Sequence, residues 1–344
     1  MKKNTKSSKL AHSRRPSVVW DNPPPYTVKT LIIVFLVLIF LMVSGRHSEM
    51  DRLVVLLTEA GGNLIGINEE SQVLNGAERL VRSMFPPQVS ETIEVSRIEN
   101  FNRDDLPLFS KIVSETVIVS NLNPITLELE QETKTREVIY SPIGYLIHIL
   151  KKMLETIEMA IWATILATVI SVPLAYMSAE NYAPNRFAYN ISRATVSFLR
   201  AVPELVSAML LVLAFGFGPI AGILALGLHA AGFLGKFYAE DIENADKGPQ
   251  EALESVGVSK VKILRFSVLP TVLPQYVAYN MYILDRNIRM ATVVGIVGAG
   301  GIGQELKGRY DMFDYSHVTT ILLIIFLTVF ILDQISSYIR MKLI

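Results

Sequence analysis

Long apolar runs constrain this chain more than any other feature of its sequence. Four segments are nearly free of charge: Leu31–Val43, Ile157–Met177, Leu205–Gly235 and Val318–Leu332. A helix needs roughly 20 apolar residues to cross the hydrocarbon layer of a bilayer, and several runs reach that length. Only 19% of the residues are charged, whereas an average soluble domain has about 25%. The sequence therefore predicts an all-α polytopic membrane protein.

The composition limits the chemistry that the chain can perform. The sequence has no cysteine, which excludes disulfides, thiolate metal sites and cysteine nucleophiles. Its five histidines never recur at the i, i+3 or i, i+4 spacing of a ligand pair, so no metal site is expected. The formal net charge of zero argues neither for nor against nucleic acid, and no nucleic-acid partner is expected.

Basic residues predict the orientation of the chain in the membrane. Residues 1–29 carry seven Lys or Arg and one acid, which indicates a cytoplasmic basic tail before a retained anchor at 30–45. Residues 46–153 are then expected to be extracytoplasmic. Within them, Ser114–Tyr140 alternates apolar and polar residues around an Asn-Pro turn, a pattern typical of a β-hairpin. We interpret residues 90–144 as a small insertion that contains β-strands.

Five further spans are predicted within residues 154–340, which makes six in total. They lie near Thr156–Met177, Ala194–Phe215, Pro219–Tyr238, Thr271–Val297 and Val318–Tyr338. The polar segment 241–267 holds four basic residues and is predicted to be cytoplasmic, as are both termini.

A glycine-rich segment follows the fifth predicted span. Gly298, Gly300 and Gly303 form G-x-G-x-x-G, which is typical of a dinucleotide-binding turn after a β-strand. Here a span precedes the glycines, and Tyr315–Leu332 lacks the acid that would hold a ribose. We therefore expect an irregular turn at the outer end of the span. Gly298, Gly300, Gly301 and Gly303 would allow positive φ angles and close helix packing in this turn.

The cytoplasmic segment is predicted to form two short amphipathic helices. Pro249 suits the first helical position, Gly257 can end the first helix, and Ser259 can cap the second. Pro270 is expected to break the second helix before the next span. From these residues alone, an ordinary helical hairpin on the surface fits equally well.

The same segment resembles the EAA loop of permease subunits in binding-protein-dependent ABC importers. That pattern is Glu-Ala-Ala, three residues, Gly, nine residues, and Ile-x-Leu-Pro. The sequence departs from it at Leu253 and Ser267. The resemblance implies that this loop is a coupling helix that docks into a cytoplasmic ATPase. The matching residues are Glu251, Ala252, Gly257, Leu269 and Pro270.

Other segments resemble the phosphonate importer permeases, including "LRAVPELV" and "NIRMATVVGIVGAGGIG". The resemblance covers Thr156–Ile344 best and leaves residues 90–144 without a counterpart. It implies a type I ABC importer permease core in the bacterial inner membrane, paired with a second copy of itself. Two ATPase subunits would hold ATP and Mg, and an external binding protein would deliver the solute. The chain has no Walker A sequence, so neither a cofactor nor ATP hydrolysis is expected in it.

Four polar residues interrupt the fifth predicted span. A charge at mid-bilayer costs about 2.5–3.5 kcal/mol on insertion scales, so such groups usually face a partner or a cavity. Asp285 and Arg289 have the i, i+4 spacing of an ion pair, whereas Arg286 has no free acid on its own helix. The pair can lock two helices together or line a path for an anion. The resemblance matches at Asp285, Asn287 and Arg289 and implies that they line the translocation pathway.

Two residues in other spans complete the candidate site. Glu204 is expected at the cytoplasmic gate, and His229 is expected to bond to a neighbouring helix. The preferred function is the transmembrane subunit of an ABC importer for phosphonate or a related phosphorus oxyanion. The alternatives are an importer of methionine or another small solute, and an ATP-independent channel or carrier.

Overall fold

A computed structural model describes residues 27–65, 71–98, 101–103, 106–107, 109–122 and 129–343. The chain divides into two compact units, residues 1–79 and residues 80–344. Nearly all of the predicted basic tail lies outside the described residues. The two units are considered separately below.

The first unit contains a strongly apolar helix. Helix α1 (Val28–His47) has 20 residues and is about 30 Å long, enough to cross a bilayer. The Thr27 side chain caps it by accepting a hydrogen bond from the Thr30 backbone N–H. Helix α2 (Met50–Leu64) follows after a left-handed residue, Glu49. Helix α3 (Gln72–Met84) begins in this unit and ends in the next.

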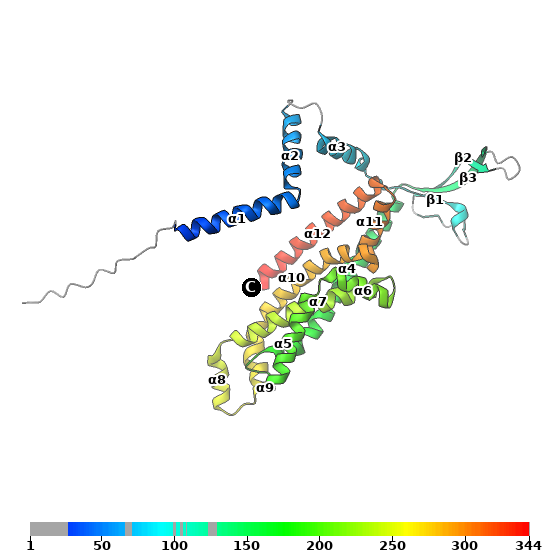
Figure 1. The fold of residues 1–344 in the computed structure, drawn as a ribbon. Helices are drawn as coiled ribbons and strands as arrows, with labels where there is room; N and C mark the ends of the chain where they lie inside the picture. The colour runs from blue at the N-terminus through cyan, green and yellow to red at the C-terminus, as the bar shows by residue number, and fades with distance from the viewer. Residues whose placement is uncertain are drawn as a thin grey trace, which may run out of the picture. The chain divides into compact units, whose positions relative to one another are not determined.

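The second unit begins with a small antiparallel sheet in the order β1-β3-β2 (Figure 1). The strands are β1 (Glu91–Glu94), β2 (Lys111–Leu122) and β3 (Leu129–Ser141), and a 3-10 turn (Val95–Arg97) follows β1. Strands β2 and β3 pair from Lys111 opposite Tyr140 to Leu122 opposite Leu129. These two strands occupy the segment whose alternating pattern indicates a hairpin. Strand β1 is four residues long and has no comparable sequence signal.

A helical bundle forms the rest of the second unit (Figure 1). Its α-helices are α4 (Gly144–Ser178), α5 (Arg186–Ala201), α6 (Glu204–Phe215), α7 (Pro219–Asn244), α8 (Lys247–Ser255), α9 (Lys260–Ile263), α10 (Leu269–Val294), α11 (Gly301–Asp311) and α12 (Tyr315–Leu343). Two π-helical turns, Leu264–Val268 and Gly295–Ala299, lie immediately before and after α10.

Helices α4 and α7 form the centre of the bundle because small residues let their backbones approach closely. A Cβ on Gly227 would lie 2.8 Å from a Leu166 methyl and 3.2 Å from the Ala163 carbonyl oxygen. Buried alanines line both helices, among them Ala160, Ala163 and Ala167 on α4 and Ala225, Ala230 and Ala231 on α7. Small residues at helix contacts are typical of membrane bundles, in which the surrounding lipid is as apolar as the core.

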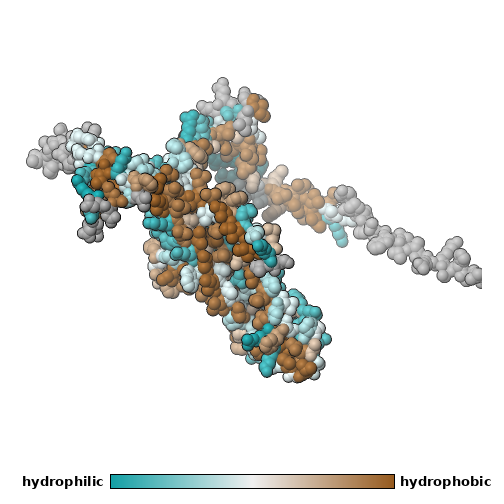
Figure 2. All heavy atoms as spheres, turned by 180° about the vertical axis from the view of Figure 1, so that it is seen from behind, coloured by the Kyte–Doolittle hydropathy of each residue, from teal (hydrophilic) through white to brown (hydrophobic). Residues whose placement is uncertain are grey.

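The outer surface of the bundle is apolar over much of its length (Figure 2). Exposed residues on α4 and α12 include Trp162, Val169, Leu323, Phe326 and Phe330. In the described residues, α1, α4, α7 and α12 are each long and apolar enough to cross a membrane. The bent pair α5–α6 would make a fifth span. The protein is therefore mostly helical, with four or five apolar spans by length and composition.

The segment predicted as a span near Ala194–Phe215 is not a single straight helix. The structure divides this segment into α5 and α6, which are bent by 91° relative to each other. The break falls at Val202 and Pro203, both of which have extended backbone conformations. Proline has no N–H for a helical hydrogen bond, and it disfavours the helical conformation of the residue before it.

The prediction that Pro270 breaks the second short helix before the next span is wrong. Helix α9 continues through the π-helical turn Leu264–Val268 into α10, and Leu264, Val268 and Leu269 all have helical angles. Pro270 lies in the first turn of α10. The π-helical turn just before it changes the backbone hydrogen-bond register, which is how a helix commonly accommodates such an irregularity.

The glycine-rich segment forms an irregular turn between α10 and α11. It follows a helix and not a strand, unlike a dinucleotide-binding turn. Gly298, Gly300 and Gly301 have φ angles of 101°, 87° and 66°, which glycine adopts without steric cost. Gly303 is needed for a different reason, because a Cβ there would lie 1.9 Å from the Thr292 carbonyl oxygen.

Side chains of α4 hold the start of α11 after this turn. Glu155 Oε1 accepts a hydrogen bond from the Gly301 N–H at 3.1 Å, and Thr156 Oγ1 accepts one from the Ile302 N–H at 2.8 Å. The first N–H groups of a helix have no partner within the helix, so these two acceptors satisfy donors that would otherwise be unpaired. The turn is therefore anchored to the centre of the bundle.

Charged residues hold the turn between α11 and α12. Arg309 lies 3.2 Å and His317 lies 2.6 Å from the Asp314 carboxylate. Burial alone would raise the pKa of Asp314. The hydrogen bonds and positive charge of His317, together with the charge of Arg309, outweigh burial and lower that pKa.

The close contact at Gly303 gives a testable prediction. Gly303→Ala should destabilise the protein by roughly 1–3 kcal/mol, because the added methyl forces the α10 and α11 backbones apart. We expect lower membrane abundance and a lower melting temperature of the purified protein. Gly308→Ala on the same helix is the matched control, since its Cβ would meet nothing within 4 Å. Equal stability of the two variants would contradict this account.

Candidate functional site

The polar residues of α10 point in three different directions. Asp285 and Arg289 form the ion pair that their spacing predicts, with 2.6 Å between Arg289 Nη2 and Asp285 Oδ2. The Asp285 side chain is 8% exposed, whereas that of Arg289 is 47% exposed. Arg289 therefore presents a paired but accessible guanidinium on the surface of the bundle.

Asn287 does not share that surface. Its side chain is fully buried, and its Nδ2 donates a hydrogen bond to Thr164 Oγ1 on α4 at 3.0 Å. Its Oδ1 atom has no hydrogen-bond partner in the described part of the chain. Two turns towards α9, Asn280 also meets α4, where Thr168 donates to its Oδ1 at 2.5 Å. In this conformation Asn287 joins two helices, and it does not lie beside Arg289.

Arg286 contributes to a buried cluster that the sequence does not predict. Its guanidinium donates a hydrogen bond to the carboxylate of Glu204, the first residue of α6. The same Glu204 oxygen lies 3.2 Å from His229 Nε2 on α7. The other ring nitrogen of His229 lies 3.0 Å from the Val202 carbonyl oxygen. As predicted, His229 is bonded to a neighbouring helix, and Glu204 joins groups from α7 and α10.

The surroundings of this cluster favour charge pairing. The side chains of Glu204, His229 and Arg286 are 12%, 8% and 23% exposed. The Arg286 guanidinium also lies 5.1 Å above the centre of the Phe233 ring. A charge in an apolar membrane helix is costly unless it is paired, so the contact between Glu204 and Arg286 offsets the cost of burying each of them. The only sequence signal was two unmatched charges of opposite sign in separate apolar runs.

The α8–α9 loop is an exposed helical corner. Gly257 has a φ of 80°, and the Gly257 and Val258 N–H groups bond to the carbonyls of Glu254 and Leu253. This pair of bonds is a Schellman motif, which ends α8 as the sequence predicts. The start of the helix differs, because α8 begins at Lys247 and Asp246 caps it. Pro249 is thus the third residue of the helix, and the Ser259 side chain makes no capping bond.

The loop residues of the EAA pattern lie on this corner or just after it. Glu251, Ala252 and Gly257 are exposed, Leu269 is half-buried, and Pro270 is exposed in the first turn of α10. Three large apolar side chains are also exposed nearby, namely Val256, Val261 and Phe266. Apolar side chains at a corner of this kind are typical of a surface that another protein covers.

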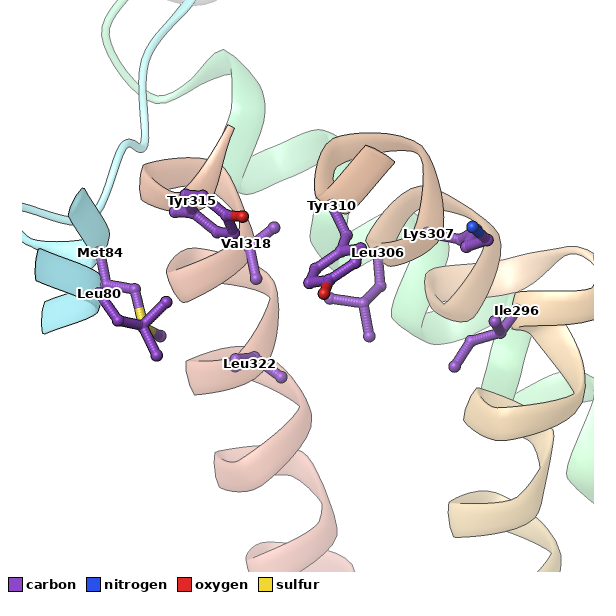
Figure 3. A pocket seen from close by; sticks show the side chains of 9 residues that line it. All are labelled: Leu80, Met84, Ile296, Leu306, Lys307, Tyr310, Tyr315, Val318 and Leu322. Carbon is purple, nitrogen blue, oxygen red and sulfur yellow. The ribbon is translucent and has the colours of Figure 1, made fainter. Parts of the chain in front are cut away.

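A cavity of about 480 Å³ lies between the end of α3, α11 and α12 (Figure 3). Its walls are mostly aliphatic and aromatic, including Leu80, Leu306 and Tyr315. Lys307 is its one basic lining residue and is paired with Asp311 at 2.6 Å. This cavity therefore does not suit a small anion. The described residues also contain no group of three or more His, Asp or Glu that could hold a metal ion.

Two solved structures have a fold similar to that of the helical bundle. A chain of the MetNI methionine ABC transporter, in an inward-facing conformation, aligns with a TM-score of 0.51 and 23% identity. The alignment covers 59% of this chain and 99% of that chain. A chain of an amino acid ABC transporter aligns with a TM-score of 0.51 and 15% identity, over 58% of this chain and 96% of that chain. The bundle therefore has the fold of these two ABC transporter chains.

The sequence comparisons place the chain in a family. Residues 171–343 match the family described as "Binding-protein-dependent transport system inner membrane component". The putative phosphite transport system permease protein HtxE of Stutzerimonas stutzeri is 56% identical over 261 residues. That alignment covers 76% of this chain and 100% of HtxE. The chain therefore belongs to the family of inner membrane permease components of binding-protein-dependent transport systems.

Three further relatives are more distant. The phosphite transport system permease protein PtxC of Stutzerimonas stutzeri is 40% identical over 56% of this chain and 70% of PtxC. The phosphate-import permease protein PhnE of Mycolicibacterium smegmatis is 40% identical over 54% of this chain and 35% of PhnE. A probable D-methionine permease, MetI of Pasteurella multocida, is 26% identical over 53% of this chain and 88% of MetI.

The Glu204–Arg286 pair predicts non-additive effects of mutation. Glu204→Gln or Arg286→Gln alone leaves one buried charge without its partner, which typically costs 3–5 kcal/mol. The double variant should be clearly more stable than either single variant. Membrane abundance and thermal stability of the purified protein measure this difference. Arg52→Gln removes one member of an exposed pair and should change stability little. If the stability lost in the double variant equals the sum of the losses in the two single variants, Glu204 and Arg286 do not stabilise each other.

Proposed function

We propose that the chain is the transmembrane subunit of an ABC importer that carries a small phosphorus oxyanion, such as phosphite or a phosphonate. The observation that carries this proposal is the 56% identity to a putative phosphite permease over that protein's whole length. The relatives named for phosphite or phosphate transport match at 40–56% identity, whereas the methionine permease matches at 26%. A methionine importer is therefore the less favoured alternative.

We infer that the exposed face of α10 lines the translocation pathway. Arg289 is nearly half exposed on a long helix, and a guanidinium is costly in contact with lipid hydrocarbon. A water-filled path between two copies of the chain would solvate it. A planar guanidinium also matches the oxygens of a phosphorus oxyanion. Asp285 would keep Arg289 in position, whereas Asn287 would act by holding α10 against α4.

The proposed topology has six spans. Helices α1, α4, α7 and α12 would cross singly, α5 and α6 would together make one bent crossing, and α10 would be the sixth. Helix α10 has 26 residues, which is long enough to span, although its charges lower its overall apolarity. The basic residues near both ends favour cytoplasmic termini and an extracytoplasmic β-sheet.

The proposed assembly is a homodimer of this chain with two cytoplasmic ATPase subunits and an extracytoplasmic binding protein. The exposed corner between α8 and α9 would dock into the ATPase, which would bind ATP and Mg. Closure of the ATPase pair would draw the two corners together and change the access of the pathway. Glu204 would act at the gate, because it connects α6 to α7 and α10.

Uptake in proteoliposomes tests the function. We expect the complex with its ATPase and binding protein to import phosphite or methylphosphonate when ATP is supplied, and not methionine. Asp285→Asn and Arg289→Gln should each reduce uptake. The double variant should recover protein abundance, because no lone charge remains. Its uptake should nevertheless stay at least about tenfold below that of the unmodified protein.

A second ion pair with the same spacing provides the control for this experiment. The double variant Lys307→Gln with Asp311→Asn removes an i, i+4 pair on α11 and should keep normal uptake. Full uptake in the Asp285→Asn, Arg289→Gln variant would reduce the α10 pair to a structural role. Uptake of methionine alone would contradict the proposed substrate class.

The coupling role of the α8–α9 corner is tested at Gly257. Its left-handed φ disfavours a β-branched residue, although a Cβ there would meet nothing within 4 Å. Because a Cβ at Gly257 clashes with nothing, Gly257→Val should leave folding and abundance intact. Because the φ angle disfavours valine, the same variant should distort the corner and abolish solute-stimulated ATPase activity. Gly257→Asn is the matched control, since asparagine tolerates this conformation better. Normal stimulation in Gly257→Val would argue against a coupling corner.

A further inference from the structure

A small polar cavity lies between α5 and α7, near the end of α4, and the pathway described above does not use it. Its volume is about 200 Å³. Three basic and two hydroxyl side chains line it, along with two aliphatic residues: Arg193, Arg200 and Lys236, with Ser178 and Ser197. Among the described residues, none that lines the cavity is acidic.

The positive charges around the cavity are only partly compensated. Arg193 lies 2.7 Å from Glu243, and Lys236 lies 3.4 Å from Glu240. Arg200 has no acidic partner among the described residues. Its Nε atom is buried without a hydrogen-bond acceptor there, although its guanidinium lies 5.7 Å from the centre of the Phe233 ring. An unpaired buried donor on a charged group is costly, and an anion in the cavity would supply the missing acceptor.

The packing of α5 on α7 fixes this arrangement. A Cβ on Gly232 would lie 2.8 Å from Arg200 Cγ and 3.0 Å from the Arg200 backbone nitrogen, so glycine allows α5 to approach there. Arg193 and Arg200 are seven residues apart and lie on the same face of α5. Arg193 is held further by its Nε, which donates to the Ser178 carbonyl oxygen at 3.0 Å.

We propose that this cavity is a second anion site that binds a phosphorus oxyanion, either free or as the phosphate of an anionic lipid headgroup. Guanidinium groups bind phosphate oxygens through paired N–H donors, and the Ser197 hydroxyl can donate to a remaining oxygen. The Ser178 hydroxyl already bonds to the Ser192 hydroxyl. The cavity has room for the oxyanion itself and a few waters, but not for a nucleotide or an acyl chain. Binding would neutralise Arg200 and connect α5 to α7 through the ligand.

The site is distinct from the Asp285–Arg289 surface of α10. It lies beside the last turns of α7, which lead into α8. If the ligand is a free anion, occupancy of the cavity would depend on the solute concentration on that side of the membrane. A lipid headgroup there would instead hold α5 in the membrane interface. The chemistry of recognition is the same in both cases.

The test uses the purified complex with its ATPase in nanodiscs, and radiolabelled orthophosphate as the probe. Arg200→Gln should weaken phosphate binding in phosphatidylcholine nanodiscs at least about tenfold, because charged hydrogen bonds are lost. Arg186→Gln is the matched control. It lies seven residues before Arg193 on α5, is paired with Glu180, and does not line the cavity. Phosphate bound at α10 is the same in both variants and cancels in the comparison.

A second measurement detects the lipid form of the ligand. Native mass spectrometry of the complex from nanodiscs that contain phosphatidylglycerol should show that lipid retained with Arg186→Gln and lost with Arg200→Gln. If Arg200→Gln loses orthophosphate binding, the ligand of the cavity is a free anion. If Arg200→Gln loses the retained lipid, the ligand is a lipid headgroup. Equal behaviour of the two variants in both measurements would overturn the proposal.

Folding and transport are checked in the same samples. Both variants should elute as intact complexes and retain basal ATPase activity. Arg200→Lys, which restores the charge without the paired donors, should bind phosphate at an intermediate level. The site does not depend on the proposed substrate. Failure to import phosphite would therefore leave this result standing, and equal binding by the variants would leave the importer proposal standing.

Discussion

The close packing of α4 on α7 is the contact on which the rest of the bundle depends. Alanines on both helices and glycines on α7 bring the two backbones together. Several other functional elements attach to one of these two helices. Helix α10 bonds to α4 through Asn287, α5 packs on α7 at Gly232, and α4 caps the start of α11.

Charge inside this apolar bundle is managed by pairing, and each pair has a different consequence. Asp285 and Arg289 lie on one helix, so their pairing leaves that helix free to move relative to its neighbours. Glu204 and Arg286 lie on different helices, so their pairing opposes any separation of α6 from α10. A change of access that separates these helices must therefore exchange the Glu204–Arg286 contact for another partner. His229 already lies within reach of the carboxylate.

The local features of the sequence were predictable, and the long-range ones were not. Apolar runs, the i, i+4 pair and the left-handed glycines all depend on neighbouring residues, and the structure shows each of them. The bend at Pro203 was missed because the apolar character continues across it. The contact between Glu204 and Arg286 joins residues 82 positions apart, so no local period reveals it. The different direction of Asn287 required knowledge of which helix covers that side of α10.

The cap that α4 provides to α11 also has a consequence for biosynthesis. Glu155 is synthesised 146 residues before Gly301, the residue whose N–H it accepts. At about 5–20 residues per second, roughly seven to thirty seconds pass before that donor exists. Lys152, one turn earlier on the same helix, lies 2.8 Å from the Glu155 carboxylate. This lysine can balance the charge while the rest of the chain is made, so Glu155 need not enter the membrane as an unpaired acid.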